Sequence, residues 1–302
     1  MLFIRWNVNP VIFSIGSREI RYYSLLFIAG FILGYYIFIW FYKREKLPLK
    51  LLEPLLYVLL GCTIVGARLG HCLFYEPDFY LAHPLEILKT WHGGLASHGG
   101  AIGVLLGLIW YARHYGRKYK FDSMWILDHT VIPIAFAGMF IRLGNLMNSE
   151  IYGHVTDLPW GFIFLRNGEV LPKHPTQIYE ALSYLILGLI LIFIYKYKWK
   201  KFNRGFIFGF FLIWLFGARF LIEFVKQPQE IFENNMVLNM GQLLSIPFII
   251  AGIIILVRSF YVKSPVCINQ EPGAFDPNAP ENRKEKKDKN NGTDKNNRKK
   301  RR

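Results

Sequence analysis

The side chains best suited to chemistry in this sequence are a few arginines and carboxylates, an asparagine and a histidine at the ends of long apolar runs. In chain order they are His98, Arg142, Asn145, Glu150, Arg219 and Glu223. The planar guanidinium of arginine matches the oxygens of a phosphate group bidentately. An imidazole, with a reference pKa of about 6.5, can accept a proton at neutral pH. These residue types together favour a site that binds a phosphate-bearing group and places a base beside it.

Several of these groups also have a purely structural interpretation. Arg219 and Glu223 are spaced i, i+4 and could form an ion pair along one helix face. Arg68 and His71, late in another apolar run, could extend toward lipid headgroups. The glycines of residues 92–100 (HGGLASHGG) could serve close helix packing alone. Glycine also allows a headgroup to approach the backbone beside an imidazole, so both interpretations stay open.

The elements that must position these groups are long apolar segments. The chain has 302 residues, of which 53% are hydrophobic and 17% aromatic. A helix needs about twenty apolar residues to cross roughly 30 Å of hydrocarbon, and such a run must be helical because lipid cannot satisfy backbone groups. We therefore expect an all-α polytopic membrane protein with seven transmembrane helices. The expected spans are about 20–42, 54–76, 95–114, 122–146, 176–196, 204–226 and 240–260.

Lysine and arginine divide the connections between these spans into two classes. The connections around residues 43–50, 113–120 and 196–204 are rich in basic residues, whereas the intervening loops are poor in them. Because cytoplasmic loops carry the excess of Lys and Arg, we expect the N-terminus outside and the C-terminus in the cytoplasm. With this orientation, all the polar clusters described above map to the outer ends of the helices.

Two segments lie outside the spans. The longest outer loop, about 147–175, contains residues 162–166, then Asn167-Gly168, then residues 169–171, which is the pattern of a hairpin with a tight turn. We expect a small extracytoplasmic head there, within a membrane catalytic domain of residues 1–263. The tail of residues 264–302 is rich in Asn, Lys, Glu, Pro and Gly, which predicts a disordered basic cytoplasmic segment.

Composition argues against two further classes of function. The net charge is +15, but much of the basic excess lies in the tail, so we do not expect a nucleic-acid partner. The three cysteines and eight histidines show no spacing typical of metal ligands, so we expect neither a metal ion nor another cofactor.

Five motifs in order carry a family resemblance over roughly residues 1–260. They are residues 66–70 (GARLG), 91–103 (WHGGLASHGGAIG), 142–153 (RLGNLMNSEIYG), 174–180 (HPTQIYE) and 217–224 (GARFLIEF). This set resembles prolipoprotein diacylglyceryl transferase, a family of seven-span enzymes of the bacterial inner membrane. The resemblance implies transfer of the diacylglyceryl group of phosphatidylglycerol to the lipobox cysteine of a prolipoprotein that still bears its signal peptide. The expected products are a thioether and glycerol phosphate, in the first step of bacterial lipoprotein maturation.

The same resemblance implies which residues are functional. The family's positions fall on Tyr23, His98, Arg142, Asn145, Glu150, Gly153, Arg219 and Glu223. The residues expected to bind phosphatidylglycerol are Arg142, Arg219, Asn145, Tyr23, Gly153 and Glu223. The residues expected to be catalytic are His98, Arg142, Arg219 and Glu150. After the last motif, residues 225–229 (VKQPQ) stand where the family usually has an arginine and then an acid, so the resemblance assigns no role to Lys226.

The implied reaction needs a base and a stabilised leaving group. A free thiol with a pKa near 8.5 is only a few per cent thiolate at pH 7, so we expect His98 to activate it. The leaving phosphate is best stabilised by fixed cations in a water-poor site. We expect Arg142 and Arg219 to hold it, with Glu150 and Glu223 orienting the two guanidinium groups.

Two other functions account for part of the pattern. A membrane transporter would distribute charged residues through the depth of the bilayer, whereas the cytoplasmic halves of the expected spans are almost purely apolar. Another phospholipid-headgroup transferase acting at the outer leaflet would share the outer arginines. It would not depend on a cysteine-bearing acceptor.

Overall fold

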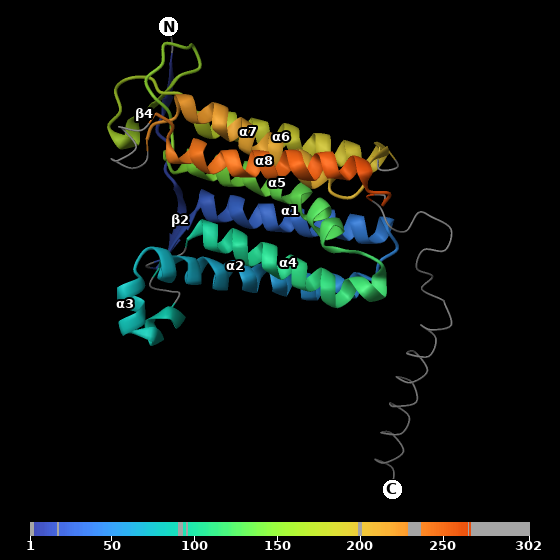
Figure 1. Ribbon diagram of the computed structural model, residues 1–302. Helices are drawn as coiled ribbons and strands as arrows, with labels where there is room; N and C mark the ends of the chain where they lie inside the picture. Colours follow the sequence, from blue (N-terminus) through green and yellow to red (C-terminus); the bar gives the residue numbers. More distant parts are fainter. Residues whose placement is uncertain are drawn as a thin grey trace.

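The computed structural model describes residues 3–16, 18–89, 93–94, 96–198, 201–228, 237–264 and 266. Long helices run side by side through this part of the chain (Figure 1). They are α1 (Tyr22–Arg44), α2 (Leu52–Phe74), α4 (Ser97–Tyr119), α5 (Ser123–Met147), α6 (Thr176–Phe193), α7 (Phe206–Ile222) and α8 (Met240–Tyr261). Shorter helical turns are η1 (Leu49–Leu51), α3 (Pro77–Ala82), η2 (Pro84–Leu88), η4 (Leu165–Asn167), the π-turn η5 (Ile194–Lys198) and η7 (Glu223–Val225).

The chain is a multi-pass membrane protein. Among the described residues, six helical segments are long and apolar enough to cross a membrane, and α4 is not one of the six. The expectation of seven spans therefore stays a prediction for α4, which coincides with the third expected span. Along its length α4 packs against α2, so it lies within the same bundle (Figure 1).

Glycine allows α2 and α4 to pack backbone against backbone. A Cβ on Gly70 would lie 2.7 Å from the Cα of Gly99, and one on Gly66 would lie 2.9 Å from the Cα of Gly103. Any larger residue would force the two helices apart. The packing interpretation of the glycines near His98 is therefore confirmed for Gly99.

The other helices gather around α5. α1 packs against α5 and lies between the α2–α4 pair and the group formed by α5 to α8 (Figure 1). Within its most apolar stretch, 61% of α5 is buried, compared with at most 39% for the other candidate spans. A helix that is apolar on all sides and buried belongs at the centre of a bundle. Polar groups on α5 consequently face protein rather than lipid.

One end of the bundle carries the small strands, α3 and the loop of residues 148–175, and we call it the head end (Figure 1). β1 (Ile4–Trp6) pairs in parallel with β4 (Phe162–Phe164), and β2 (Val11–Ile15) pairs antiparallel with β3 (Arg18–Arg21). Gly16, with φ +61°, turns the chain between β2 and β3. This hairpin was not expected from the sequence.

The loop expected to form a tight-turned hairpin differs in its details. Phe162 and Lys173 do exchange backbone hydrogen bonds of 2.9 and 2.8 Å as an antiparallel bridge. However, Leu165–Asn167 form a 3-10 turn, so the connection is longer than the tight turn that the sequence predicts. The difference has a non-local cause, because β4 pairs with β1, a strand about 160 residues earlier in the chain.

The opposite end of the bundle holds the basic connections after α1, α4 and α6, and we call it the basic end. Buried there, the Glu45 carboxylate accepts hydrogen bonds from Trp125 Nε1 at 2.9 Å and from Tyr195 Oη at 2.8 Å. His129 Nε2 lies 2.5 Å from the same carboxylate. Since Trp125 and His129 belong to α5 and Tyr195 to η5, this cluster joins the end of α1 to α5 and to the turn after α6. The expectation of a disordered tail concerns residues that lie almost entirely outside the described ones.

Candidate active site

Oppositely charged side chains alternate in a buried cluster at the head end, where α5, α6 and α7 meet. Arg142 Nε of α5 lies 2.8 Å from Glu180 Oε2 of α6, and Glu180 is fully buried. Lys226 Nζ lies 3.4 Å from Glu223 Oε2 and 3.9 Å from Glu180 Oε1. Buried charges persist only when they are paired, so these contacts hold two cations in place beneath the head.

Lys226 is only 2% exposed and lies just beyond the last candidate-span residue of α7. Its burial lowers the pKa of the ammonium group, and the neighbouring Glu180 and Glu223 carboxylates oppose that shift. The direction of the pKa change shows that desolvation outweighs attraction at this position. A cation held in this way responds strongly to any further negative charge brought beside it.

Arg219 lies at the edge of the same cluster. Within the described residues no ion pair joins Arg219 to Glu223, which pairs with Lys226 instead. The interpretation of Arg219 and Glu223 as an internal ion pair is therefore wrong. Arg219 acts electrostatically on Lys226 and on Tyr184, a neighbour that it shares with Arg142. Two guanidinium groups thus converge on one region.

A strained turn follows α5 and presents Glu150. Ser149 and Ile151 on either side of it have φ values of +56° and +62°, which are unusual for residues with a side chain and especially for a β-branched one. Three consecutive carbonyl oxygens of this turn each accept a side-chain hydrogen bond. The donors are Asn167 Nδ2 to Ser149 O at 2.7 Å, Gln177 Nε2 to Glu150 O at 2.6 Å and Thr176 Oγ1 to Ile151 O at 2.8 Å. A strained backbone that is held in place by several hydrogen bonds is typical of functional sites.

The Glu150 carboxylate is exposed on this turn but is held in one orientation. Its Oε1 accepts hydrogen bonds from Asn145 Nδ2 at 2.7 Å and from Asn148 Nδ2 at 3.2 Å. The Tyr23 ring packs beside Gly144, where a Cβ would lie 2.7 Å from Tyr23 Cδ2. Tyr23 also interacts electrostatically with Glu150 and with Arg142. The expected headgroup residues Tyr23 and Asn145 therefore lie with the charged cluster.

Gly153 joins the loop after α5 to the chain after α7. It forms a backbone bridge with Lys226, and its N–H donates to His174 O at 2.8 Å. A Cβ at this position would collide with the carbonyl oxygen of Val225. Gly153 therefore serves the site by allowing two backbone segments to touch, which brings Lys226 beneath the Glu150 turn.

His98 lies on α4, whereas the charged cluster is built by residues of α5, α6 and the end of α7. The histidine lies in the first turn of α4 with an exposed side chain. In the described part of the chain no hydrogen bond or ion pair joins His98 to Arg142 or Arg219. Its role as a base therefore stays a prediction. His92, in the preceding half of the same motif, lies outside the described residues.

Arg68 has a structural role rather than a headgroup-binding one. Its side chain is buried, and the guanidinium donates to five backbone carbonyl oxygens of η2 and of the loop that follows it. The acceptors are Glu86 at 2.6 Å, Ile87 at 2.9 Å, Lys89 at 3.2 Å, Gly93 at 2.6 Å and Gly94 at 3.2 Å. Arg68 therefore holds this loop against α2, and the interpretation that it reaches toward lipid headgroups is wrong.

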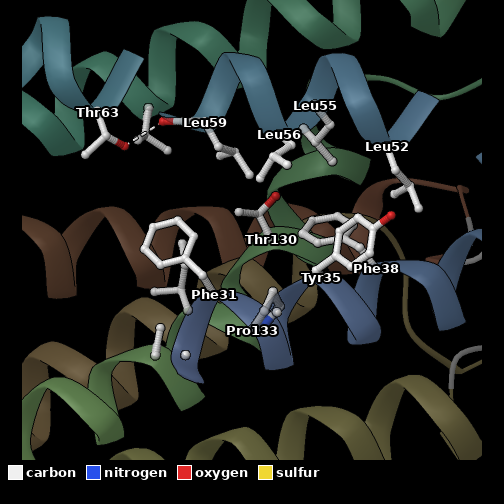
Figure 2. A pocket seen from close by; sticks show the side chains of 15 residues that line it. Phe31, Tyr35, Phe38, Leu52, Leu55, Leu56, Leu59, Thr63, Thr130 and Pro133 are labelled. Atoms are coloured by element: carbon white, nitrogen blue, oxygen red, sulfur yellow. Dashed lines mark hydrogen bonds between the residues drawn. The ribbon is translucent and has the colours of Figure 1, made fainter. Parts of the chain in front are cut away.

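An apolar cavity of about 190 Å³ lies between α1, α2, α4 and α5 (Figure 2). Phe31, Tyr35 and Phe38 line it from α1, and Leu55 and Leu59 line it from α2. Ala137 of α5 also lines it, and Arg142 follows five residues later, about 7.5 Å farther along the helix axis. If Arg142 binds the phosphate of a lipid, an acyl chain of that lipid can enter this apolar cavity instead of remaining wholly in the bilayer.

Residues 10–258 match the family model described as prolipoprotein diacylglyceryl transferase. The chain belongs to this family. It is similar to relatives named phosphatidylglycerol--prolipoprotein diacylglyceryl transferase in three bacteria. The relative in Tolumonas auensis is 46% identical over 87% of this chain and 100% of its own length. Those in Chloroherpeton thalassium and Bacteroides fragilis are 43% and 45% identical, over 85% and 84% of this chain and 94% of each relative.

The sequence does not predict a role for three residues in the site of this diacylglyceryl transferase family member. Glu180 closes the motif of residues 174–180, Gln177 lies within it, and Lys226 stands where the family pattern departs. The ionic partner of Arg142 is Glu180 rather than the expected Glu150, and Glu223 pairs with Lys226 rather than orienting Arg219. One signal could have identified Glu180, because a carboxylate in an apolar segment requires a buried partner.

Proposed function

We propose that this chain transfers the diacylglyceryl group of phosphatidylglycerol to the lipobox cysteine of prolipoproteins that still carry their signal peptides. The family and the names of the relatives support both substrates. One observation of the structure carries the proposal, which is the buried pair of Arg142 with Glu180. It fixes a guanidinium near the head end of α5, five residues before the helix ends at Met147, where we propose that the phosphate of a membrane lipid binds.

The reaction is a group transfer at a carbon atom. The thiol sulfur attacks the carbon of the diacylglyceryl unit that bears the phosphate. A carbon–sulfur bond forms, and the bond between that carbon and the phosphate oxygen breaks. Glycerol phosphate leaves with the bonding electron pair, and the thiol proton passes to a base. Arg142 and Arg219 stabilise the charge that grows on the departing phosphate, since preformed donors act most strongly where charge develops.

His98 is our candidate for the base. Its exposed side chain at the start of α4 can be reached by a peptide, while Arg142 and Arg219 lie on α5 and α7. His98 on α4 would then contact the thiol, and the two arginines on α5 and α7 would contact the phosphate. This separation suits a reaction in which the nucleophile and the leaving group lie on opposite sides of one carbon atom.

The His98→Gln variant tests this assignment. We expect thioether formation to slow by about 10²- to 10⁴-fold, the usual contribution of general base catalysis, and the acidic limb of the pH–rate profile to disappear. His83→Gln is the matched control, since His83 is another exposed histidine of the head end. Substantial activity of His98→Gln with an unchanged acidic limb would remove His98 as the base.

We further propose that the chain resides in the bacterial inner membrane with its N-terminus outside and its C-terminus in the cytoplasm. The separation of the head from the basic connections supports this orientation. A cysteine placed at exposed Glu19 should react with a membrane-impermeant thiol reagent in intact spheroplasts. Labelling only after lysis would reverse the assignment.

The decisive experiment uses the purified protein in detergent with phosphatidylglycerol and a lipobox peptide. Mass spectrometry should show one diacylglyceryl group added to the peptide cysteine. A peptide with serine in place of that cysteine is the control and should stay unmodified. Consumption of the lipid without dependence on the cysteine would instead indicate a different headgroup transferase.

A further inference from the structure

Four buried side-chain oxygen atoms around Glu150 have no hydrogen-bond partner in the described part of the protein. They are Asn145 Oδ1, Asn148 Oδ1, Ser149 Oγ and Gln177 Oε1. The whole residues Asn145, Ser149 and Gln177 are 6%, 1% and 0% exposed. Buried polar atoms are nearly always paired in native proteins, so a group of orphaned atoms in one place needs an explanation.

The orientation of the two most buried amides follows from their partners. Asn145 Nδ2 donates to the Glu150 carboxylate, and Gln177 Nε2 donates to the Glu150 carbonyl oxygen. Both of these oxygens can only accept, so the amide oxygen of each side chain has to point away from them. The site therefore offers acceptors in fixed directions, and it calls for a ligand that donates hydrogen bonds.

These acceptors stand at a definite position relative to the phosphate-binding cations. Asn145 follows Arg142 by three residues on α5, which runs toward the head, and Gln177 precedes Glu180 by three residues on α6, which starts at the head. Residues three apart share a helix face, so both amides lie about one turn, roughly 5 Å, beyond the Arg142–Glu180 pair on the head side. A group attached to the phosphate and pointing out of the membrane would reach them.

We infer that Gln177, together with Asn145 and Ser149, accepts hydrogen bonds from the hydroxyl groups of the headgroup glycerol. These residues would thereby select phosphatidylglycerol among phospholipids. The inference rests on the proposed function. Glycerol supplies neutral hydroxyl donors, which match fixed acceptors. A choline headgroup has no donor to offer them and brings a positive charge toward Arg142 and Lys226.

The test compares two lipids with the same acyl chains in the same assay of thioether formation. One is phosphatidylglycerol and the other is phosphatidylpropanol, whose headgroup lacks both hydroxyls. The wild-type protein should prefer phosphatidylglycerol by at least about 100-fold in kcat/KM, because sites built to bind a hydroxyl strongly reject analogues without it. In Gln177→Met this preference should fall by about tenfold or more, and in Ser149→Ala by a smaller factor.

Thr176→Val is the matched control. Thr176 is as buried as Gln177 and also holds a carbonyl of the Glu150 turn, but it has no orphaned acceptor. Its loss should lower activity on both lipids equally and leave their ratio unchanged. Because the ratio is taken within one variant, differences in the amount of folded protein cancel.

Each outcome decides between the possibilities. An unchanged ratio in both Gln177→Met and Ser149→Ala would overturn the inference and leave these residues a purely structural role. Equal use of the two lipids by the wild-type protein would also overturn it, while leaving the proposed function intact. Absence of thioether formation from phosphatidylglycerol would instead contradict the proposed function itself.

Discussion

The two ends of this helix bundle both bury ionisable side chains, but they treat them differently. At the basic end, Glu45 is surrounded by donors from Trp125, His129 and Tyr195. Asp128 of α5 likewise accepts from the backbone N–H groups of Gly205 and Phe208 at 2.6 and 2.8 Å, which caps the start of α7. At the head end, buried oxygen atoms around Glu150 have no hydrogen-bond partner among the residues that the structure describes, and the backbone is strained.

The comparison shows that a buried polar cluster by itself does not indicate an active site. Glu45 with His129 is a carboxylate beside an imidazole, which resembles a catalytic pair, yet its polar atoms are satisfied within the protein. A satisfied network rigidifies a structure, whereas a partly satisfied one is prepared for a ligand. The basic end therefore fastens the helices, and the head end is where we propose that the chemistry takes place.

The largest expected effect is on stability, at the basic end. Glu45→Ala removes one member of a buried pair and should lower the free energy of unfolding by about 3–5 kcal/mol. Thermal unfolding in detergent measures this loss, and activity per folded molecule should stay unchanged. A variant that kept its melting temperature but lost activity would contradict the division between the two ends.

Arg142→Gln should have the largest effect on catalysis. Removing one preformed donor from a charge-stabilising site typically slows the reaction by about 10²- to 10³-fold. Thioether formation from phosphatidylglycerol measures it, with Arg117→Gln at the basic end as the control variant. Near-normal activity of Arg142→Gln would refute the role of this guanidinium in holding the phosphate.

Glu180→Gln should sharpen the comparison, because it keeps the shape of the side chain but removes the charge that positions Arg142. We expect kcat to fall by about tenfold to 10²-fold, since displacement of a group by about 1 Å has such effects. A merely structural role would instead lower the melting temperature and leave kcat per folded molecule unaltered. Measuring both quantities on the same preparation separates the two.

The smallest effect is expected from Tyr111→Phe near the basic end. Tyr111 Oη donates to Leu51 O at 2.9 Å and lies 2.9 Å from Tyr42 Oη, so it joins α1, α4 and the turn before α2. Its loss leaves buried groups unpaired and should cost about 1–3 kcal/mol in the free energy of unfolding. Catalysis should not change. Tyr57→Phe, an exposed position on α2, is the control and should leave stability unaltered.

Helix positions could be predicted closely because the signal for them is local. The expected span 122–146 corresponds to Ser123–Met147, and the expected span 176–196 begins, as α6 does, at Thr176. The apolar runs give the approximate positions of the helices, and local signals such as the N-cap Asp122 and Pro175 before α6 mark where they start. The gathering of Arg142, Asn145 and Glu150 could also be anticipated, since they lie within one turn-and-helix segment.

Pairings between distant segments could not be predicted in this way. The contact of Arg142 with Glu180 joins two helices, and the five carbonyls bound by Arg68 belong to a short helical turn and the loop after it, which have no periodic sequence pattern. The β2–β3 hairpin was missed because its few residues directly precede a long apolar run, which dominates a search for spans. Each of these features depends on tertiary geometry rather than on spacing in the chain.

The parallel pairing of β1 with β4 sets an order for biogenesis. Ile4–Trp6 emerges from the ribosome first, but its partner Phe162–Phe164 is synthesised only after α5. Until then the amino-terminal strand has an unpaired edge, which is the kind of surface that chaperones protect. Closure of the head is therefore a late event, and a nascent chain arrested before residue 162 would keep its first strand open to proteases.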